Sequence, residues 1–384
     1  MRKICIVTGT RAEWGLLVRL ARLIEADEEL QLQIIATNMH LSDVYGLTYK
    51  EIEADGFKID YRVPMETDGD TRRDTVKSMA RAMDGFADAY QILQPDMIVV
   101  LGDRYEILVA VTAALIFKIP VAHIHGGEIT MGAYDDAIRH SITKMSHLHL
   151  TSTEAYRQRV IQMGEQPSNV FNVGAIGVEN IKKIELWDKA QTEKSLDNFE
   201  LDRNTILITY HPVTLENNTA ENQINELLEA LDNLPQVKVI FTMPNSDTEN
   251  LIIARKIKDW CAVNGKRSGW FVSLGIKRYL SVLQYIGAVV GNSSSGIIEV
   301  PSFGIPTINI GDRQKGRLAA VSVINCQPTA SDITTKIREV IGREPTSVSN
   351  PYEKENTAQE ILQIIKTHNS KDIIKKHFFN IQNG

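Results

Sequence analysis

Four residues between positions 103 and 135 are suited to moving protons in a reaction. Asp103 follows the apolar run Met97–Leu101, and His125 and Glu128 belong to a His-Ile-His-Gly-Gly-Glu segment. Asp135 comes seven residues after Glu128. Carboxyl groups in different surroundings can take separate acid and base roles. The structural alternative is that they cap helices or pair with cations, as aspartates at strand ends often do.

The two histidines of that segment also raise the question of a metal site. His123 and His125 would lie on one face of a strand, because alternate side chains share a face. No third ligand follows at a spacing typical of zinc. We therefore expect no metal, and a packing role for His123.

A second set of residues is suited to holding phosphates. Ser293, Ser294 and Ser295 stand between an apolar run and a helical pattern, where hydroxyls and free N–H groups at a helix N-terminus form a diphosphate cradle. Glu299, one turn later, is placed to accept hydrogen bonds from two ribose hydroxyls. His211, which precedes a proline, could donate to a phosphate oxygen. The alternative for the serines is a simple linker.

Two arginines are expected near the same ligand. Arg11 lies in a Thr-Gly-Thr-Arg-Ala-Glu segment directly after the first predicted strand, at the entrance to a helix that favours anions. This segment is not the Gly-x-Gly-x-x-Gly pattern of dinucleotide-binding proteins. Arg313 belongs to a loop, 311–317, that carries three cations. A structural ion pair for Arg11 and a solvated charge run for the loop are the alternatives.

The elements that must position these residues alternate along the chain. Short β-branched runs and longer helical patterns indicate an α/β protein with parallel sheets. Strands are predicted at Lys3–Val7, Gln33–Thr37, Met97–Leu101, Val121–Ile124, His149–Thr151, Val170–Val173, Ile206–Tyr210, Lys238–Thr242, Gly269–Val272, Ala288–Gly291, Thr307–Asn309 and Ser322–Asn325. Helical patterns include Leu16–Ile24, Arg73–Leu93, Tyr105–Phe117, Ile297–Val300 and Ala358–Lys366.

The alternation divides into two Rossmann-like halves. We expect a first domain at residues 1–175 for a sugar and its acid–base groups, and a second at 176–366 for a nucleotide. A polar stretch from Gly174 to about Asn204 would join them, and the tail at about 367–384 is free to pack back on the first domain. Ligands of such folds bind in the crevice at the carboxyl ends of the strands.

The composition excludes several classes of protein. The 384 residues are 43% hydrophobic and 23% charged, and 42 basic against 48 acidic residues give a net charge of −6, which argues against nucleic-acid binding. No apolar run approaches the roughly 18 residues of a membrane span, and the N-terminus lacks a signal-peptide pattern. Three scattered cysteines form no zinc or disulfide framework. We expect a cytoplasmic enzyme.

Taken together, the motifs resemble the hydrolysing UDP-N-acetylglucosamine 2-epimerases of bacterial sialic-acid biosynthesis. The segments that carry the resemblance are Gly9–Glu13, Gly102–Arg104, His125–Glu128, Ile138–Ser146, His211-Pro212, Gly291–Gly296 and Ile308–Arg317. They extend over nearly the entire chain. The resemblance implies a glycosyltransferase-B-like fold, with two Rossmann-type domains around a ligand cleft, usually as a homodimer, and no cofactor.

The reaction that the resemblance implies converts UDP-N-acetylglucosamine and water to N-acetylmannosamine and UDP. UDP is eliminated across carbons 1 and 2 to leave a glycal, and water then adds with inversion of carbon 2. The groups that would hold UDP are Arg11, His211, Ser293, Ser294, Ser295, Glu299 and Arg313. The acidic groups nearest the sugar would be Asp103, Glu128 and Asp135.

One position departs from part of that family. Some hydrolysing relatives and the non-hydrolysing epimerases carry a glutamate where this chain has His125. Either His125 acts as the base at carbon 2 or Glu128 takes that role, and the sequence leaves both open.

Four other functions fit part of the sequence. A hydrolysing 2-epimerase of UDP-N,N'-diacetylbacillosamine, for legionaminic-acid synthesis, would share every motif. A non-hydrolysing epimerase would have proline where Ala12 stands and a Glu-Ala-Gly-Leu-Arg segment in place of 125–128. A retaining glycosyltransferase or an inactive nucleotide-sugar-binding regulator would not require the acidic residues Asp103, Glu128 and Asp135.

Overall fold

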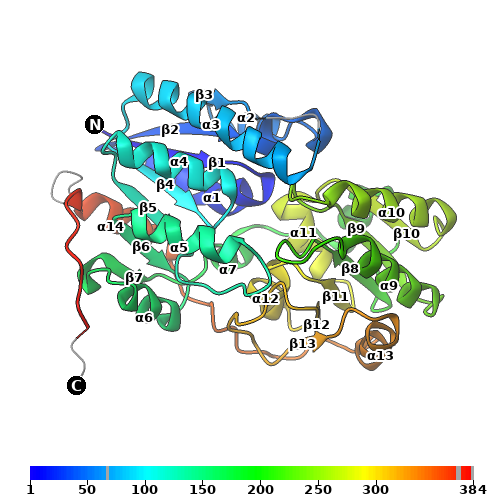
Figure 1. Ribbon diagram of the computed structural model, residues 1–384. Helices are drawn as coiled ribbons and strands as arrows, with labels where there is room; N and C mark the ends of the chain where they lie inside the picture. The colour runs from blue at the N-terminus through cyan, green and yellow to red at the C-terminus, as the bar shows by residue number, and fades with distance from the viewer. Residues whose placement is uncertain (66–68, 369–372, 382–384) are drawn as a thin grey trace.

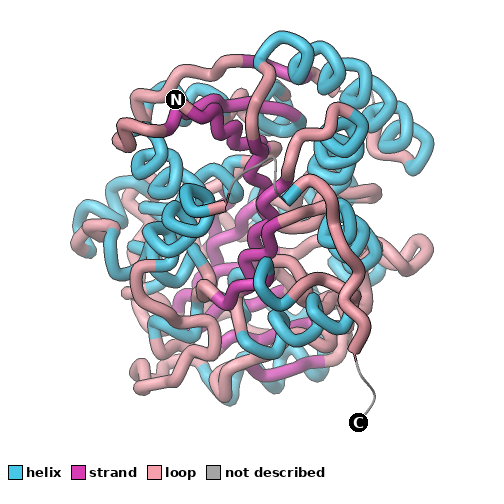
Figure 2. Tube along the Cα trace, turned by 90° about the vertical axis from the view of Figure 1, so that its left-hand side faces the viewer, coloured by secondary structure: helices cyan, strands magenta, loops and turns pink. Residues whose placement is uncertain are grey.

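Two parallel β-sheets, each with helices on both faces, make up the fold in this computed structural model, which describes residues 1–65, 69–368 and 373–381. Figure 1 shows the two sheets side by side, and Figure 2 shows strands running through the interior with helices outside them. The expected α/β class with parallel sheets is confirmed.

The first sheet has seven strands in the order β3-β2-β1-β4-β5-β6-β7, and the second has six in the order β10-β9-β8-β11-β12-β13. The strands of the first sheet are β1 (Arg2–Thr8), β2 (Leu30–Thr37), β3 (Tyr61–Val63), β4 (Met97–Leu101), β5 (Val121–Ile124), β6 (Leu148–Thr151) and β7 (Val170–Asn172). Those of the second are β8 (Thr205–Thr209), β9 (Lys238–Thr242), β10 (Ser268–Phe271), β11 (Ala288–Gly291), β12 (Thr307–Ile310) and β13 (Val323–Cys326).

The helices that follow the strands include several that the sequence did not indicate. Those up to the second sheet are α1 (Arg11–Glu25), α2 (Tyr49–Ala54), α3 (Arg72–Leu93), α4 (Tyr105–Ile116), α5 (Asp135–Met145), α6 (Glu154–Gln162), α7 (Ile176–Lys183) and α8 (Lys189–Ser195). The later ones are α9 (Ala220–Asp232), α10 (Asn250–Val263), α11 (Gly275–Leu283), α12 (Ser295–Ile298), α13 (Ala330–Val340) and α14 (Thr357–Thr367).

Alternation along the strands fills both faces of each sheet. Ile4 and Ile6 of β1 join a buried cluster that includes α1 and α14, whereas Cys5 and Val7 join another with α3 and α4. In the second sheet Ile206 and Ile208 of β8 pack with α9, α10 and α13, and Leu207 of β8 packs on the opposite side with α11. Two-sided burial explains why these strands read as nearly continuous apolar runs.

Every strand expected from the sequence is present, with ends that differ by no more than three residues. The additional strand, β3, has three residues at the edge of the first sheet, too few to form a pattern. The polar junction expected before Asn204 contains α7 and α8.

The last helix lies on the first sheet, not the second. Ile361 and Ile365 of α14 are fully buried in the cluster that holds Trp14 and Leu17 of α1, and Figure 1 shows α14 beside the first sheet. The expected second domain, 176–366, included this helix. We therefore propose that the chain returns to the first domain before Thr357.

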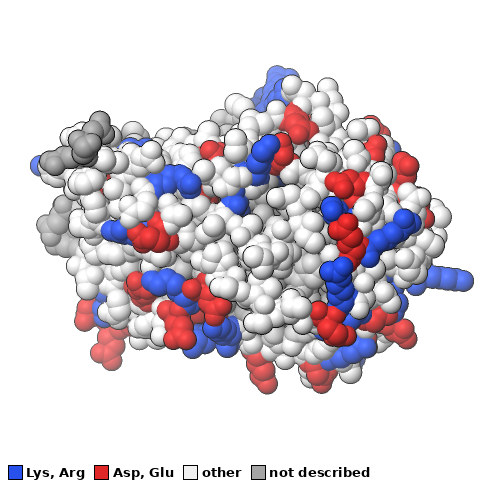
Figure 3. Space-filling view, turned by 90° about the horizontal axis from the view of Figure 1, so that it is seen from below, with Lys and Arg blue, Asp and Glu red and all other residues white. Residues whose placement is uncertain are grey.

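The tail that follows α14 also contacts the first domain. The backbone N–H of Phe379 donates to the carbonyl oxygen of Gly164 at 2.9 Å, and Nζ of Lys376 donates to the carbonyl oxygen of Lys144 at 2.7 Å. On the face shown in Figure 3, acidic and basic side chains are interspersed. Within the described ranges, no helix combines the length and apolar character needed to span a membrane.

Truncating Ile361 tests the placement of α14. Ile361→Ala should lower the free energy of unfolding by about 2–5 kcal/mol, because it leaves a cavity in a packed core. Amide hydrogen exchange should accelerate in α1 and β1 and stay unchanged in α9. The matched control is Gln363→Ala on the exposed side of the same helix, which should change neither quantity. Faster exchange confined to the second sheet would contradict the packing described here.

Candidate active site

A cavity of about 310 Å³ lies between the two sheets and is lined by residues from both. Most of the residues singled out from the sequence line it: Arg11, Asp103, Asp135, His211, Ser293, Ser294, Ser295, Glu299 and Arg313. His125 and Glu128 are not among the lining residues. The fold therefore brings together residues that are up to about 300 positions apart in the sequence.

Strand order explains this convergence. In the first sheet the order reverses between β1 and β4, and in the second between β8 and β11. The segments that follow these four strands contain Arg11, Asp103, His211 and the serine segment, in that order. Such reversal points open a crevice at the carboxyl ends of parallel strands. Here the two crevices face one cavity.

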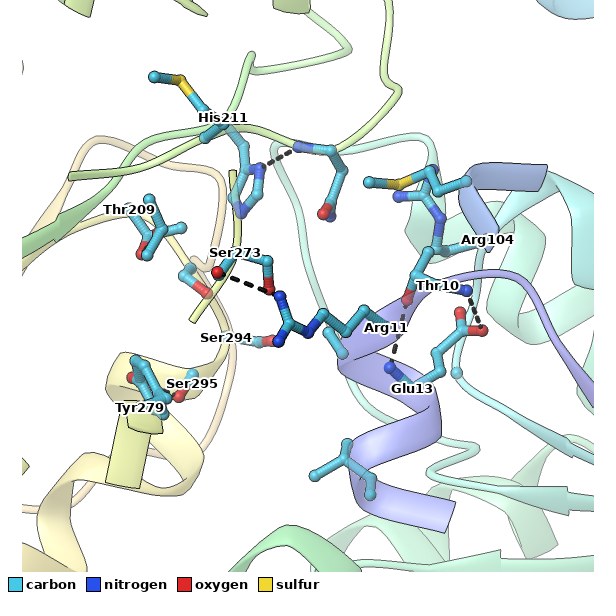
Figure 4. Close-up of a pocket in the computed structure, with 18 of the residues that line it drawn as sticks. Thr10, Arg11, Glu13, Arg104, Thr209, His211, Ser273, Tyr279, Ser294 and Ser295 are labelled. Carbon is cyan, nitrogen blue, oxygen red and sulfur yellow. Dashed lines mark hydrogen bonds between the residues drawn. The ribbon is translucent and has the colours of Figure 1, made fainter. Parts of the chain in front are cut away.

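Arg11 reaches from the first domain toward the second. α1 begins with a capping box, in which the Thr10 hydroxyl accepts from the Glu13 N–H and the Glu13 carboxylate accepts from the Thr10 N–H. This fixes the first turn, and Arg11 then donates to the carbonyl oxygen of Ser273 at 3.1 Å while pairing with Glu51 at 2.5 Å. Figure 4 shows its guanidinium extended across the cavity beside Ser294.

The serine segment makes a tight turn after β11. Gly291 has φ of +133°, and a Cβ there would collide with the carbonyl oxygen of Thr209 on β8, so only glycine allows this approach. The Ser295 hydroxyl lies 2.6 Å from the hydroxyl of Tyr279. The sequence predicted a helix at Ile297–Val300, but α12 is a single turn at Ser295–Ile298. The groups that the turn presents to the cavity are therefore its hydroxyl and N–H groups, because α12 is too short to contribute a sizeable helix dipole.

His211 is held as a neutral hydrogen-bond donor. Its Nδ1 accepts from the backbone N–H of Asn245 at 3.2 Å, which leaves the proton of the neutral ring on Nε2. Burial lowers the pKa of His211 well below its usual value, and the charge of Arg313 adds to the effect. The Asn292 side chain bonds both the N–H and the carbonyl oxygen of His211, at 2.7 and 2.8 Å.

Glu299 stands at the end of α12 and is almost fully buried. Burial raises its pKa to about 7, although Ser295 and Arg317 favour the ionised form. A Cβ on Gly177 would collide with the Glu299 carboxylate. With a pKa near 7, Glu299 can be protonated or ionised at neutral pH, and its ionised form can accept hydrogen bonds from hydroxyl groups of a ligand.

The ionised form of Asp103 is stabilised by a neighbouring arginine. The guanidinium of Arg139, a residue of α5 with 1% exposure, contacts its carboxylate and also donates to the carbonyl oxygen of Glu128 at 2.8 Å. Desolvation raises the pKa of Asp103, but the positive charges of Arg139 and Arg317 outweigh it, and the pKa lies below the usual value. Asp103 is thus a carboxylate with a fixed orientation.

Asp135 has the opposite character. Burial raises its pKa to about 7, and the nearby charges of Asp103 and Asp247 act in the same direction. Arg313, from the second domain, lies 3.4 Å away and partly offsets the shift. Two carboxyl groups with pKa values driven apart can serve as acid and base in one site.

His125 and Glu128 form a pair that does not line the cavity but adjoins Arg317, which does. Arg317 lines the cavity and its guanidinium contacts the Glu128 carboxylate, which also accepts from the Ser152 hydroxyl at 2.7 Å. Burial raises the pKa of Glu128, but Arg317 outweighs it and keeps the pKa below its usual value. Nδ1 of His125 lies 3.5 Å from Glu128, and burial lowers the pKa of the imidazole.

Two arginines that define this site were not predicted from the sequence. Arg139 and Arg317 lie in segments already quoted, but nothing marked them as partners of Asp103 and Glu128. For Arg139 a signal existed, because it follows Asp135 and Asp136 by one helical turn in a polar helix.

His123 has the expected packing role, with Nε2 2.7 Å from the carbonyl oxygen of Gly102. In the part of the chain that the structure describes, no group of three or more His, Cys, Asp or Glu side chains is arranged to hold a metal ion.

Comparison with known proteins identifies the family. The chain matches the family model described as UDP-N-acetylglucosamine 2-epimerase over residues 22–366. It is 47% identical to a hydrolysing GDP/UDP-N,N'-diacetylbacillosamine 2-epimerase of Campylobacter jejuni, an alignment covering 85% of this chain and 84% of the relative. It is 41% identical to polysialic acid biosynthesis protein P7 of Escherichia coli, with 99% and 98% covered.

The fold agrees with this result. A crystal structure of UDP-GlcNAc 2-epimerase from Neisseria meningitidis bound to UDP-GlcNAc superposes with a TM-score of 0.75 at 18% identity, covering 95% of this chain and all of the other. The expected glycosyltransferase-B-like arrangement of two Rossmann-type domains is confirmed. The matches over nearly the whole chain show that this protein belongs to the UDP-N-acetylglucosamine 2-epimerase family.

Proposed function

We propose that this protein is a hydrolysing 2-epimerase, which converts UDP-N-acetylglucosamine and water to N-acetylmannosamine and UDP. The observation that carries the proposal is the division of the cavity. Its second-domain wall presents hydroxyl, imidazole and guanidinium groups suited to a nucleoside diphosphate, and its first-domain wall presents Asp103 and Asp135. Hydrolysing 2-epimerases are also among the proteins that this chain resembles in sequence.

The diphosphate would lie at the serine turn. Nε2–H of His211 and the hydroxyls of Ser293–Ser295 would donate to its oxygens, while Arg11 and Arg313 would neutralise its charge. Glu299 would accept hydrogen bonds from the ribose hydroxyls.

The chemistry explains why so many positive and donor groups face the diphosphate. The hydrogen on carbon 2 of the sugar is not acidic, so the bond from carbon 1 to the diphosphate oxygen must break ahead of proton removal. Stabilising charge as it develops on the departing UDP is then the main requirement. Water next adds its oxygen to carbon 1 and a proton is delivered to carbon 2 from the opposite face.

Neither candidate for the base lines the cavity in this structure, and hydrogen bonding favours His125 over Glu128. Glu128 is bound by Arg317 and Ser152, which lowers its basicity, whereas Nε2 of His125 has no hydrogen-bond partner among the described residues. A carboxylate beside Nδ1 holds an imidazole in the tautomer whose Nε2 can accept a proton. His125 also has φ of +67°, in the left-handed region that non-glycine residues adopt less often.

A second substrate has a specific observation in its favour. The 47% identical relative from Campylobacter jejuni is described as a 2-epimerase of GDP/UDP-N,N'-diacetylbacillosamine, whereas the 41% identical relative is described as a polysialic acid biosynthesis protein. UDP-N,N'-diacetylbacillosamine is therefore the alternative substrate.

The homodimer expected from the sequence also stays a proposal. The exposed Ile116 at the end of α4 is one apolar side chain available for contact. Light scattering would test the oligomeric state.

Isotope labels test the reaction itself. Each UDP-sugar is incubated with the protein in deuterated water enriched in heavy oxygen, and the free sugar is identified by NMR and mass spectrometry. We expect N-acetylmannosamine, or its diacetamido counterpart, with deuterium on carbon 2 and the oxygen label on carbon 1. Release of UDP with an unexchanged, uninverted sugar would mean simple hydrolysis and would overturn the proposal.

Substitution of the first-domain groups tests their roles. Asp103→Asn and His125→Asn should each lower turnover by roughly 100-fold or more with UDP affinity nearly unchanged, because a proton-transfer group is lost without a nucleotide contact. Glu128→Gln should cost less, on the order of 10-fold, if it only orients His125. A larger loss for Glu128→Gln than for His125→Asn would assign the base to Glu128, and a parallel loss of UDP affinity would refute the division of the cavity.

The pH dependence of UDP binding tests Glu299. Ribose hydroxyls donate to the ionised carboxylate, so the affinity for UDP should rise as the pH increases through about 7, the pKa of Glu299. Glu299→Gln should remove this component and weaken binding at pH 8 by about 1–3 kcal/mol in calorimetry. The titration of UDP itself is the same for both proteins, so the difference between them isolates Glu299. Identical pH profiles would exclude a ribose contact.

A further inference from the structure

One buried arginine of the first domain bonds directly to the second domain. Arg104 follows Asp103, and its Nε donates to Glu106 of α4 at 2.8 Å. The same guanidinium donates to the Ser246 hydroxyl at 2.8 Å and to Oδ1 of Asp247 at 3.3 Å. Glu106 and Asp247 are almost completely buried, so this cation lies between two carboxylates that water does not reach.

Ser246 gathers further contacts from the first domain. The hydroxyl of Tyr105 lies 3.0 Å from its hydroxyl, and the side-chain amide of Asn38 donates to the same oxygen at 3.3 Å. Three side chains from two segments of the first domain, after β2 and after β4, thus meet at a single hydroxyl of the second. Such convergence is possible only while the two domains stand at this separation.

The segment that carries Ser246 is also joined to the diphosphate site. The preceding residue, Asn245, uses its backbone N–H to hold Nδ1 of His211. Asn245 and His211 line the cavity, but Ser246 and Asp247 do not. Figure 4 shows Arg104 and His211 on opposite sides of the cavity.

We propose that Arg104, Ser246 and Asp247 form a latch that holds the two domains closed around the nucleotide, with Arg104 as a positioning residue for the reaction. Glu106 fixes the guanidinium in the first domain, and Ser246 and Asp247 meet it only when the cleft is closed. A diphosphate bound at His211 orders the segment through Asn245 and so favours the latch. In an open cleft Asp247 is hydrated; in the closed one Arg104 compensates its desolvation.

Closure of the latch also changes the surroundings of Asp135, a step that rests on the function proposed above. Asp135 is faced by Asp103, Asp247, Arg104 and Arg313, with the Tyr134 side chain adjacent. Asp247 and Arg313 come from the second domain and approach Asp135 only on closure. Burial and the two aspartates outweigh the arginines and raise the pKa of Asp135 to about 7.

Variants in the second domain test the latch without disturbing the first-domain core. Ser246→Ala and Asp247→Asn should each enlarge the radius of gyration in small-angle X-ray scattering with UDP bound, and should weaken UDP binding about three- to tenfold. Neither side chain lines the cavity, so a lost ligand contact cannot explain such weakening. Asp259→Asn, which removes an exposed carboxylate of α10 in the same domain, is the matched control and should change neither.

A double-mutant cycle links these residues to Arg104. Arg104→Ala should produce the same expansion, and Ser246→Ala should cost less in that background than in the wild type, because the two substitutions share one contact. Fully additive effects, or scattering and UDP affinity equal to wild type in Ser246→Ala and Asp247→Asn, would overturn the latch. These measurements use UDP alone, so they remain decisive even if neither UDP-sugar is turned over, an outcome that would count against the proposed function only.

The pH profile separates positioning from mere stabilisation. Asp247→Asn removes a negative charge beside Asp135, so the limb of the kcat/KM profile nearest pH 7 should move to lower pH. A variant that only weakened the fold would lower kcat/KM evenly across the pH range. An unmoved limb in Asp247→Asn, with Asp259→Asn as reference, would exclude the coupling of closure to Asp135.

Discussion

Carboxylates buried in the cleft are paired with arginines, mostly from the opposite domain. Arg317 and Arg313 of the second domain face Glu128 and Asp135 of the first, and Arg104 of the first faces Asp247 of the second. A buried ion without its partner costs several kcal/mol, so each pair favours the arrangement in which both domains close on the cavity. The acid–base groups and the domain interface are therefore stabilised by the same contacts.

Periodicity in the sequence was sufficient to predict the sheets, because their strands are buried on both faces and read as apolar runs. It was insufficient where few residues or distant packing decide the structure. Tyr61–Val63 is too short to show a pattern. The helix at Thr357–Thr367 was recognised from its apolar face, but nothing in an amphipathic pattern says which sheet that face covers, and it packs on a helix more than 300 residues earlier.

The candidate site likewise contains residues that the sequence could predict and residues that it could not. Residues directly after strands, such as Asp103, His211 and Ser293, could be predicted because strand ends converge in parallel sheets. Their partners could not, because the Glu128–Arg317 and Arg104–Asp247 pairs join residues 189 and 143 positions apart and depend on how two domains meet. The protonation states depend on charged neighbours, Arg139 for Asp103 and Asp247 for Asp135, so residue types alone could not separate ionised Asp103 from Asp135, whose pKa lies near 7.

Arg313 connects the two halves of the proposed reaction. It donates to the Asn292 carbonyl oxygen beside the serine turn and lies 3.4 Å from Asp135. A diphosphate at the turn would attract this guanidinium more strongly than one carboxylate does, because it carries more negative charge. Asp135 would then lose its main stabilising cation while Asp103 and Asp247 remain beside it, and its pKa would rise further. Nucleotide binding would thus leave Asp135 protonated when a proton must be supplied, and departure of UDP would return Arg313 to it and restore the carboxylate.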